Sequence, residues 1–432
     1  MTPRALHQLD ERLTGFLEDL TAPMGRSERR HWAHVYLQGL LLDGERKSVE
    51  PLAERIPGAD VQALRQFLGQ SPWEVEEVQR RLALKVIETL SEPEVWILDE
   101  TSFPKAGEHS VGVARQYCGA LGKIANCQIA LSLHWSSGEA SCPLSWRLYL
   151  PEGWLADRRR AEEVKLPDGV AYKSKTRLAL ELVDQALAWK LPSLPVIGDS
   201  AYGNSFEFRQ ALRQRQLQYV MAVEPSTVVW TEAPPVPVPP AKPMGRPRRY
   251  APVSALPTAR SLQEVAKALP RSAWQTVVWR AGTKGPMRSR FAKLPAWAAH
   301  GWKAQQHPER VCEWLLIEWP LTASEPTGYW LASLGQQLVG LRRLVRLAKS
   351  RWRVEQDYRE LKGELGLDHF EGRHWLGWHH HVTLVSMAFA FLRAEQARAK
   401  KNFWCDLAHD SSAAAGSADS PGGTLPLVPD HV

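Results

Sequence analysis

The sequence predicts a mixed α/β fold, and three observations support this prediction. Two short apolar segments, residues 95–98 and 194–198, have the length and composition of buried strands. Segments with helical spacing alternate with strand-like segments between residues 94 and 223. A proline-rich, basic stretch then interrupts this pattern, and helical spacing returns from Val339. We therefore expect an α/β core that is interrupted by an insertion.

Length and composition narrow the class of protein. The chain has 432 residues, of which 44% are apolar and 23% charged, as in a globular protein of two or three structural units. The longest apolar run, residues 384–392, is about half of a bilayer span, and no signal-peptide pattern opens the sequence. Five cysteines without a CxxC pair favour reduced thiols over disulfides or a zinc site. We expect a soluble, cytoplasmic protein without a membrane partner.

Residues 1–90 predict a helical region. The stretch 26–42 has helical spacing, Ser48 can begin a second helix, and a Pro57-Gly58 turn precedes a third segment at 59–68. A helix, a short glycine-containing turn and a second helix are compatible with a DNA-binding helix-turn-helix. An ordinary helical hairpin explains the same pattern equally well.

Residues 91–225 predict the first part of the core. The expected order is three strands, a helix, a strand, a helix and a strand, at residues 95–98, 109–117, 126–135, 173–189, 194–198, 205–215 and 218–223. Residues 336–400 are expected to form the second part of the core, with helical spacing at 339–365 and 382–398. The composition of residues 401–432 predicts a disordered tail.

Residues 226–335 predict a basic, tryptophan-rich insertion. Eight prolines between Pro234 and Pro252 exclude a helix or a central strand there, and strand-like runs follow at 276–279, 314–319 and 329–334. Fourteen Lys or Arg and three Glu fall between Ser226 and Arg310, whereas the whole chain has a net charge of +7. The remainder of the chain is therefore slightly acidic. Positive charge concentrated in one segment indicates a nucleic-acid partner.

Two carboxylates follow the two buried strands. Asp99 and Asp199 each come directly after an apolar segment, and a strand end is a rigid support for a metal ligand. Either residue alone is weak evidence, because an Asp at a strand end often caps the next turn.

A third carboxylate lies on a predicted helix between two cations. Arg351, Glu355 and Lys362 are spaced by four and seven residues, so they fall on one face of the helix. This pattern suits a site that holds a metal ion beside a phosphate, although a solvated helix with ion pairs would also produce it. Three carboxylates from separate elements are what two-metal phosphodiester chemistry requires.

These segments resemble a known family, the DDE transposases of bacterial insertion sequences. The resemblance covers residues from about 25 to 400 and is strongest at 96–105, 109–118, 196–203 and 351–355. It implies an RNase H-like fold in which Asp99, Asp199 and Glu355 are the catalytic, metal-binding acids. One branch of the family has a strand-rich insertion before the Glu and a Tyr-x2-Arg-x3-Glu-x6-Lys motif. Arg351, Glu355 and Lys362 match this motif, but Ala348 replaces its Tyr.

Other candidates rank lower. Glu100 faces away from Asp99 on an extended chain, and Asp357, Glu360 and Glu364 lack the flanking Arg and Lys. Consecutive His379, His380 and His381 cannot converge on one ion from a helix. Arg246, Arg248 and Arg249 form a basic loop that could enter a DNA groove, and Trp274, Trp279, Trp297 and Trp302 could stack on bases or pack in a core.

The resemblance implies cut-and-paste transposition: hydrolysis at the element's ends, then strand transfer into target DNA. It implies two Mg²⁺ ions with Mn²⁺ as a substitute, transposon ends and target DNA as partners, a homodimer on DNA, and a place in the bacterial cytoplasm near the nucleoid. DNA contacts are expected from Arg351, Lys362, Arg246, Arg248 and Arg249. Two alternatives stay open: a non-catalytic DNA-binding regulator derived from a transposase, and a metal-dependent nuclease without joining activity.

Overall fold

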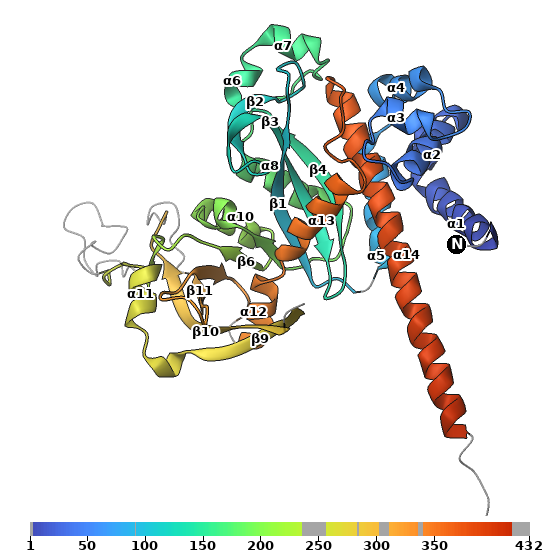
Figure 1. Cartoon of the computed structure of the whole chain (residues 1–432). Helices are drawn as coiled ribbons and strands as arrows, with labels where there is room; N and C mark the ends of the chain where they lie inside the picture. The colour runs from blue at the N-terminus through green and yellow to red at the C-terminus, as the bar shows by residue number, and fades with distance from the viewer. Residues whose placement is uncertain are drawn as a thin grey trace, which may run out of the picture.

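The computed structural model describes residues 3–90, 92–235, 256–282, 285–301, 311–335 and 340–416. Figure 1 shows a group of N-terminal helices, a central sheet flanked by helices, a second strand-rich part that extends the sheet, and a long C-terminal helix. This mixed α/β architecture confirms the predicted fold class. Arg246, Arg248, Arg249 and Trp302 lie outside the described residues.

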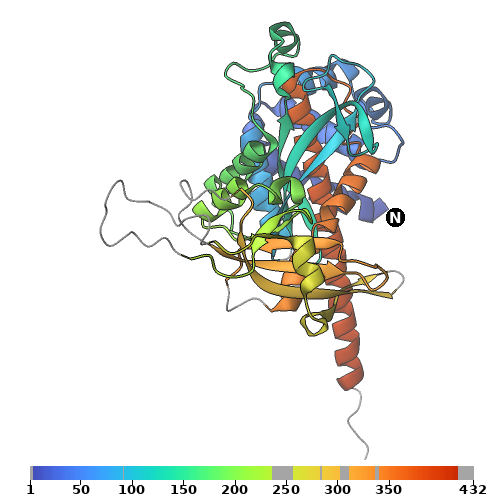
Figure 2. The same cartoon turned by 90° about the vertical axis from the view of Figure 1, so that its left-hand side faces the viewer.

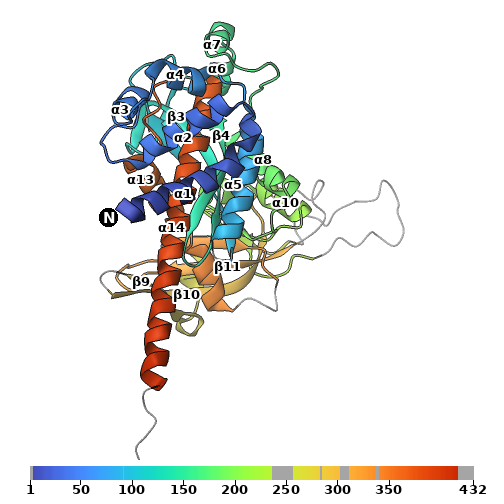
Figure 3. The same cartoon turned by 90° about the vertical axis from the view of Figure 1, so that its right-hand side faces the viewer.

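The N-terminal region is helical, as expected. Its five α-helices are α1 (Pro3–Thr21), α2 (Ser27–Leu41), α3 (Val49–Glu54), α4 (Val61–Gln70) and α5 (Val75–Thr89). Gly58, with a φ of 79°, makes the turn between α3 and α4, and the Asp60 side chain caps α4. Of these, α2, α4 and α5 pack against the C-terminal helix α14 (Trp375–Gly416), which runs past them in Figures 1 and 3. They are thereby joined to the core.

One continuous sheet contains every strand that the structure describes, in the order β2-β3-β1-β5-β6-β12-β11-β10-β7-β8, with β4 beside β3 and β9 beside β10. The core strands are β1 (Val95–Pro104), β2 (Ala114–Cys118), β3 (Lys123–Ser136), β4 (Ser141–Tyr149), β5 (Val196–Gly198) and β6 (Tyr219–Ala222). β1 is antiparallel to β3 and parallel to β5. The two apolar segments of the sequence, residues 95–98 and 194–198, are therefore neighbours in the sheet.

The insertion extends this sheet. Its strands are β7 (Val228–Trp230), β8 (Arg260–Ser261), β9 (Gln275–Gly282), β10 (Gly285–Ala298), β11 (Cys312–Trp319) and β12 (Gly328–Ala332). β12 pairs with β6, so the core and the insertion share backbone hydrogen bonds. Figure 2 shows the yellow and orange strands of the insertion next to the green part of the core. A second apolar cluster lies between these strands and α11 (Leu262–Ala268).

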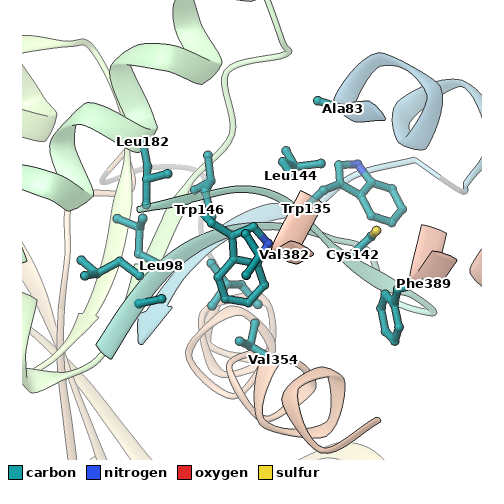
Figure 4. Packing of buried hydrophobic residues seen from close by; sticks show 14 of the residues in the cluster. Ala83, Leu98, Trp135, Cys142, Leu144, Trp146, Leu182, Val354, Val382 and Phe389 are labelled. Carbon is teal, nitrogen blue, oxygen red and sulfur yellow. The ribbon is translucent and has the colours of Figure 1, made fainter. Parts of the chain in front are cut away.

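Helices cover both faces of the core sheet. α8 (Lys175–Ala188) packs on β3 and β4, while α13 (Trp352–Gly363) and α14 also contact β4. In Figure 4, Leu182 of α8 and Val354 of α13 approach the strands from opposite sides, and Trp146 lies between the sheet and α13. The layers fix α13, which carries Glu355, against the face of the sheet.

Several expected boundaries were wrong. β1 continues to Pro104 instead of ending before Asp99, because ten consecutive residues pair with β3. The helix expected at 339–365 is divided into α12 (Leu341–Ala348) and α13, and α14 begins at Trp375 and continues to Gly416, into the segment expected to be a tail. Strands β4 and β10 were missed, because prolines and polar residues interrupt their apolar patterns. Within the described residues, no helix has both the length and the apolar character of a membrane span.

Candidate active site around Asp99, Asp199 and Glu355

Asp99 lies in the middle of β1 and is almost fully buried. The backbone N–H of Glu100 donates to its Oδ1 at 2.9 Å, and Arg351 Nη1 donates to its Oδ2 at 2.7 Å. Both carboxylate oxygens therefore have partners, as a buried charge requires.

Asp199 follows β5 directly and is the N-cap of the short helix α9 (Ser200–Gly203), where it accepts a hydrogen bond from the backbone of Ala201 at 3.0 Å. In the parallel pairing of β1 and β5, Ile97 lies opposite Ile197. Each Asp comes two residues after its Ile, so Asp99 and Asp199 lie at the same level on neighbouring strands. Asp199 does cap a turn, but the register also places it beside Asp99.

Glu355 reaches the same place from α13. Arg351 Nη2 donates to Glu355 Oε1 at 2.7 Å, and the other terminal nitrogen of this guanidinium binds Asp99. One arginine therefore joins a carboxylate of the sheet to a carboxylate of the helix. The side chain of Glu355 is 56% exposed, so the site is open to solvent on the helix side.

The charges of the three acids influence one another. Burial raises the pKa of Asp99 to about 7, Arg351 opposes this rise, and the charges of Asp199 and Glu355 add to it. Burial by itself would lower the pKa of Arg351, but the same three carboxylates hold that pKa above its usual value. A concentration of negative charge that a cation stabilises is therefore built into this position.

The donor set fits a divalent metal ion in its chemistry. Carboxylate oxygens are the ligands that Mg²⁺ and Mn²⁺ prefer. Among the described residues, however, no three His, Cys, Asp or Glu side chains are already close enough together to hold an ion. Arg351 lies between Asp99 and Glu355 instead.

Lys362 lies farther along α13. Its Nζ donates to the backbone carbonyl of Ser102 at 2.8 Å and lies over the ring of Phe103. Burial lowers the pKa of this lysine. Since Ser102 is three residues beyond Asp99 on β1, Lys362 anchors the far end of α13 to the strand that carries Asp99.

The competing acids have other partners. Glu100 pairs with Lys175 at 2.8 Å, on the other side of β1 from the site. Asp357 is buried between His134 and Arg393, and Glu360 pairs with the same arginine at 2.9 Å. Glu364 ends α13 more than two turns from Glu355. The geometry thus separates Glu355 from the acids beside it in the sequence.

The three consecutive histidines bind different parts of the protein. Nδ1 of His379 and of His380 faces the carbonyls of Trp375 and Leu68, respectively. His381 contacts the hydroxyl of Tyr36 and the carbonyls of Gly366 and Leu367. Burial lowers the pKa of all three, to about 3 for His379 and His381 and about 4 for His380. They stabilise the junction of α14 with its neighbours.

Sequence reasoning missed the polar residues behind the site, which are Ser132, His134, Asp357, Tyr358 and Arg393. Asp357 was considered only as a rival of Glu355. Two signals were available: Ser132 and His134 alternate within an apolar strand, and Asp357 lies on the apolar side of its helix. Neither signal identifies a partner, because these contacts span more than 200 residues.

Comparison with known proteins agrees with this geometry. The family model for DDE superfamily endonucleases matches residues 16–286, which include Asp99 and Asp199 and end before Glu355. A probable transposase for insertion sequence element IS701 from Microchaete diplosiphon is 29% identical over 194 residues, 44% of this chain and 48% of that protein, so the chain spans about half the length of this relative.

DDE superfamily endonucleases generally use divalent metal ions. The mixed sheet, its flanking helices and the family match together confirm the predicted RNase H-like fold class. The match extends over more than half of the 432 residues. The protein belongs to the DDE superfamily of endonucleases.

Proposed function

We propose that this protein is a transposase that catalyses cut-and-paste DNA transposition, by metal-dependent hydrolysis at the ends of an element and strand transfer into target DNA. The observation that carries this proposal is the approach of Asp99, Asp199 and Glu355 from two neighbouring strands and one helix, with Arg351 between them. The likeness to a probable insertion-sequence transposase supports it.

Asp99, Asp199 and Glu355 would hold two Mg²⁺ ions, for which Mn²⁺ would substitute. When bound, such ions supply activation of the attacking water or 3′-hydroxyl and stabilisation of the leaving oxygen. The chain supplies the rest of the site. Burial and the backbone N–H of Glu100 fix the orientation of Asp99, and Arg351 partly offsets the charges of Asp99 and Glu355 until DNA binds.

Arg351 is the residue best suited to contact the scissile strand. Its guanidinium is a fork of donors that matches a carboxylate or a phosphate equally well. Movement of this group from Asp99 and Glu355 to a DNA phosphate would free both acids while the phosphate arrives. Lys362 would contact the same strand after release from Ser102, which would require the loss of one hydrogen bond.

DNA is the expected substrate and partner, both as element ends and as target. We assign the long-range attraction to the basic insertion, including Arg246, Arg248 and Arg249, and a second contact to the α3–α4 helix pair. A homodimer would handle two ends together, and action on chromosomal DNA would place the protein in the bacterial cytoplasm.

Two other functions compete with this proposal. A non-catalytic regulator would not need Asp99, Asp199 and Glu355 together, so the presence of all three argues against it. A nuclease without joining activity would use the same acids. Incubation of the protein with pre-cut ends and a target plasmid separates these functions, because only a transposase joins the ends.

The decisive experiment substitutes the three acids. Asp99→Asn, Asp199→Asn and Glu355→Gln should each abolish strand cleavage in Mg²⁺, while DNA binding in a metal chelator remains. Glu360→Gln is the matched control, because this acid lies on the same helix and pairs with Arg393 instead of Arg351. Cleavage by Glu355→Gln at a near wild-type rate would overturn the assignment.

A further inference from the structure

A hairpin at the edge of the core sheet presents large apolar side chains to solvent. Tyr117 of β2 is 64% exposed, Ile124 of β3 is 61% exposed, and Leu121 in the turn between them is 48% exposed. Tyr117 lies directly opposite Ile124 in the antiparallel pairing, so both side chains project from the same face. Clustered exposed apolar side chains of this size indicate an interaction surface.

We propose that this hairpin is a DNA-binding element that contacts the duplex beside the cleaved phosphate. Arg115 lies two residues before Tyr117 and therefore on the same exposed face, and Lys123, which pairs with Cys118 on the opposite face, adds a second cation where the turn ends. No Asp or Glu occurs between residues 110 and 138. Apolar side chains flanked by cations, without acids, suit a surface whose cations bind phosphates while the apolar groups pack against sugars and bases.

The hairpin is attached to the catalytic strand. The backbone N–H of Ala120 in the turn donates to Ser102 Oγ at 2.9 Å, and the carbonyl of Ser102 accepts from Lys362 at 2.8 Å. Ser102 lies roughly 10 Å from Asp99 along β1, at about 3.3 Å per residue. A duplex that has a phosphate at Asp99 and runs along β1 covers this distance with about three base pairs, at about 3.4 Å each. This inference rests on the proposed function in that it takes DNA to bind at Asp99.

Two double variants test this surface by separating its apolar and charged contributions. The full chain is titrated in chelator with a fluorescent duplex of mixed sequence at several salt concentrations. Tyr117→Ser with Ile124→Ser should weaken binding about 10-fold without changing the salt slope. Arg115→Ala with Lys123→Ala should flatten the slope by about 1.8, from two lost phosphate contacts. Leu84→Ser, which changes an exposed apolar residue of α5, is the matched control and should bind like wild type.

Wild-type binding by both double variants would overturn the proposal. If Tyr117→Ser with Ile124→Ser instead dissociates an oligomer in sedimentation and leaves DNA affinity per protomer unchanged, the hairpin is an interface between protein copies and the proposal is wrong. Loss of cleavage in Glu355→Gln is independent of both outcomes, so failure of the hairpin proposal is distinguishable from failure of the proposed active site.

A separate observation concerns the side of α13 that faces the sheet. Asp357 is 1% exposed, and both of its oxygens are used: Oδ2 accepts from His134 Nδ1 at 3.1 Å, and Oδ1 accepts from Arg393 Nη2 at 3.1 Å. His134 belongs to β3 and Arg393 to α14. One carboxylate, two residues after Glu355, therefore joins three elements.

A second hydrogen bond reinforces this contact. The hydroxyl groups of Tyr358 and Ser132 lie 2.6 Å apart, and Ser132 is the residue of β3 directly opposite Asp99. β3, which pairs with β1 at Asp99, therefore also holds α13, the helix that carries Glu355. We infer that Asp357, with His134, is a positioning residue that sets the distance between Asp99 and Glu355 and so the affinity of the site for metal.

The test measures metal binding as well as cleavage, and it too assumes that Glu355 belongs to the metal site. Asp357→Asn keeps the shape of the side chain but removes its charge. Mn²⁺ titrated into the full chain and followed by calorimetry should show half-saturation at an about 10-fold higher concentration, with DNA affinity in chelator unchanged. Cleavage at limiting Mn²⁺ should fall by a similar factor and recover at saturating Mn²⁺.

Glu313→Gln is the matched control, because it disrupts another buried ion pair, Arg209–Glu313 at 3.0 Å, which joins α10 (Phe206–Gln214) to β11 and does not include α13. Thermal unfolding by circular dichroism identifies the fraction folded for each variant. Wild-type Mn²⁺ half-saturation in folded Asp357→Asn, or an equal shift in Glu313→Gln, would overturn the positioning role. If Glu355→Gln binds Mn²⁺ and cuts normally, the proposed site itself fails.

Discussion

The core and the insertion share one sheet but use tryptophan differently. Trp96, Trp135 and Trp146 of the core strands are completely buried. In the insertion, Lys293 lies 3.8 Å from the ring centroid of Trp314, and Arg290 lies 4.5 Å from that of Trp319. The core thus gains stability from removal of apolar surface from water, while the insertion combines partial burial with cation–π contacts.

This difference bears on the two roles that the sequence left open for the tryptophans of the insertion. Trp279 packs against Phe291 and lies near the ammonium of Lys349, and Trp274 packs edge-on against Trp319. These rings already have protein partners, so of the two alternatives, packing describes them better than base stacking.

The comparison predicts unequal costs for removal of a tryptophan. Trp146→Ala should reduce the free energy of unfolding by about 3–5 kcal/mol, because it leaves a cavity and removes the hydrogen bond to Ser386. Trp314→Ala should cost about 1–2 kcal/mol, from partial burial and one cation–π contact. Urea denaturation of both variants measures the difference. Equal losses would mean that the insertion is packed as tightly as the core.

The next prediction concerns pH and the buried acid of the core. The folded protein raises the pKa of Asp99 from 3.8 to about 7. Ionisation of Asp99 is therefore less favourable in the folded protein than in the unfolded chain. The free energy of unfolding decreases as pH rises from about 4 to 7. Asp99→Asn removes this titration, so at pH 8 in chelator it should be more stable than wild type by up to about 4 kcal/mol.

Urea denaturation at pH 5 and pH 8 measures this effect. The advantage of Asp99→Asn should grow between the two values and then stay constant at higher pH. An advantage that does not depend on pH would mean that Asp99 is ionised throughout this range and that Arg351 fully offsets its burial.

A smaller effect should separate binding from cleavage. Arg246→Ala, Arg248→Ala and Arg249→Ala combined should flatten the dependence of log affinity on log salt by about 2.7, or 0.9 for each phosphate contact. Lys362 lies in the core, and Lys362→Met should slow single-turnover cleavage of bound DNA more than it weakens DNA binding. If the triple variant keeps the wild-type salt slope, the loop that contains these three arginines does not contact DNA.

The smallest expected effect is at the boundary of the two regions. Arg280 of β9 lies 3.7 Å from the ring centroid of Trp352, the first residue of α13. Arg280→Met should cost only about 0.5–1 kcal/mol of stability. Hydrogen exchange should nevertheless increase at the start of α13 and not at its end, where Lys362 holds Ser102. Uniform exchange along α13 would show that the insertion does not support the helix.

The sequence by itself determined the fold class, the helical N-terminal region, the second buried strand with Asp199 at its end, and the helical face that carries Arg351, Glu355 and Lys362. These features depend on short-range patterns: the period of apolar residues, turn residues, and spacing along one helix. The same patterns could not show that β1 continues past Asp99, because that depends on pairing with β3.

Only the tertiary structure decided what each acid contacts. Glu355 and Asp357 are two residues apart, yet one faces Arg351 and solvent and the other faces His134 and Arg393. The exposure of the β2–β3 hairpin and the continuity of the sheet into the insertion also depend on contacts between distant segments. Spacing in the sequence determines which side chains share one face of a helix or strand. The packing of helices and strands against each other determines which groups those side chains contact.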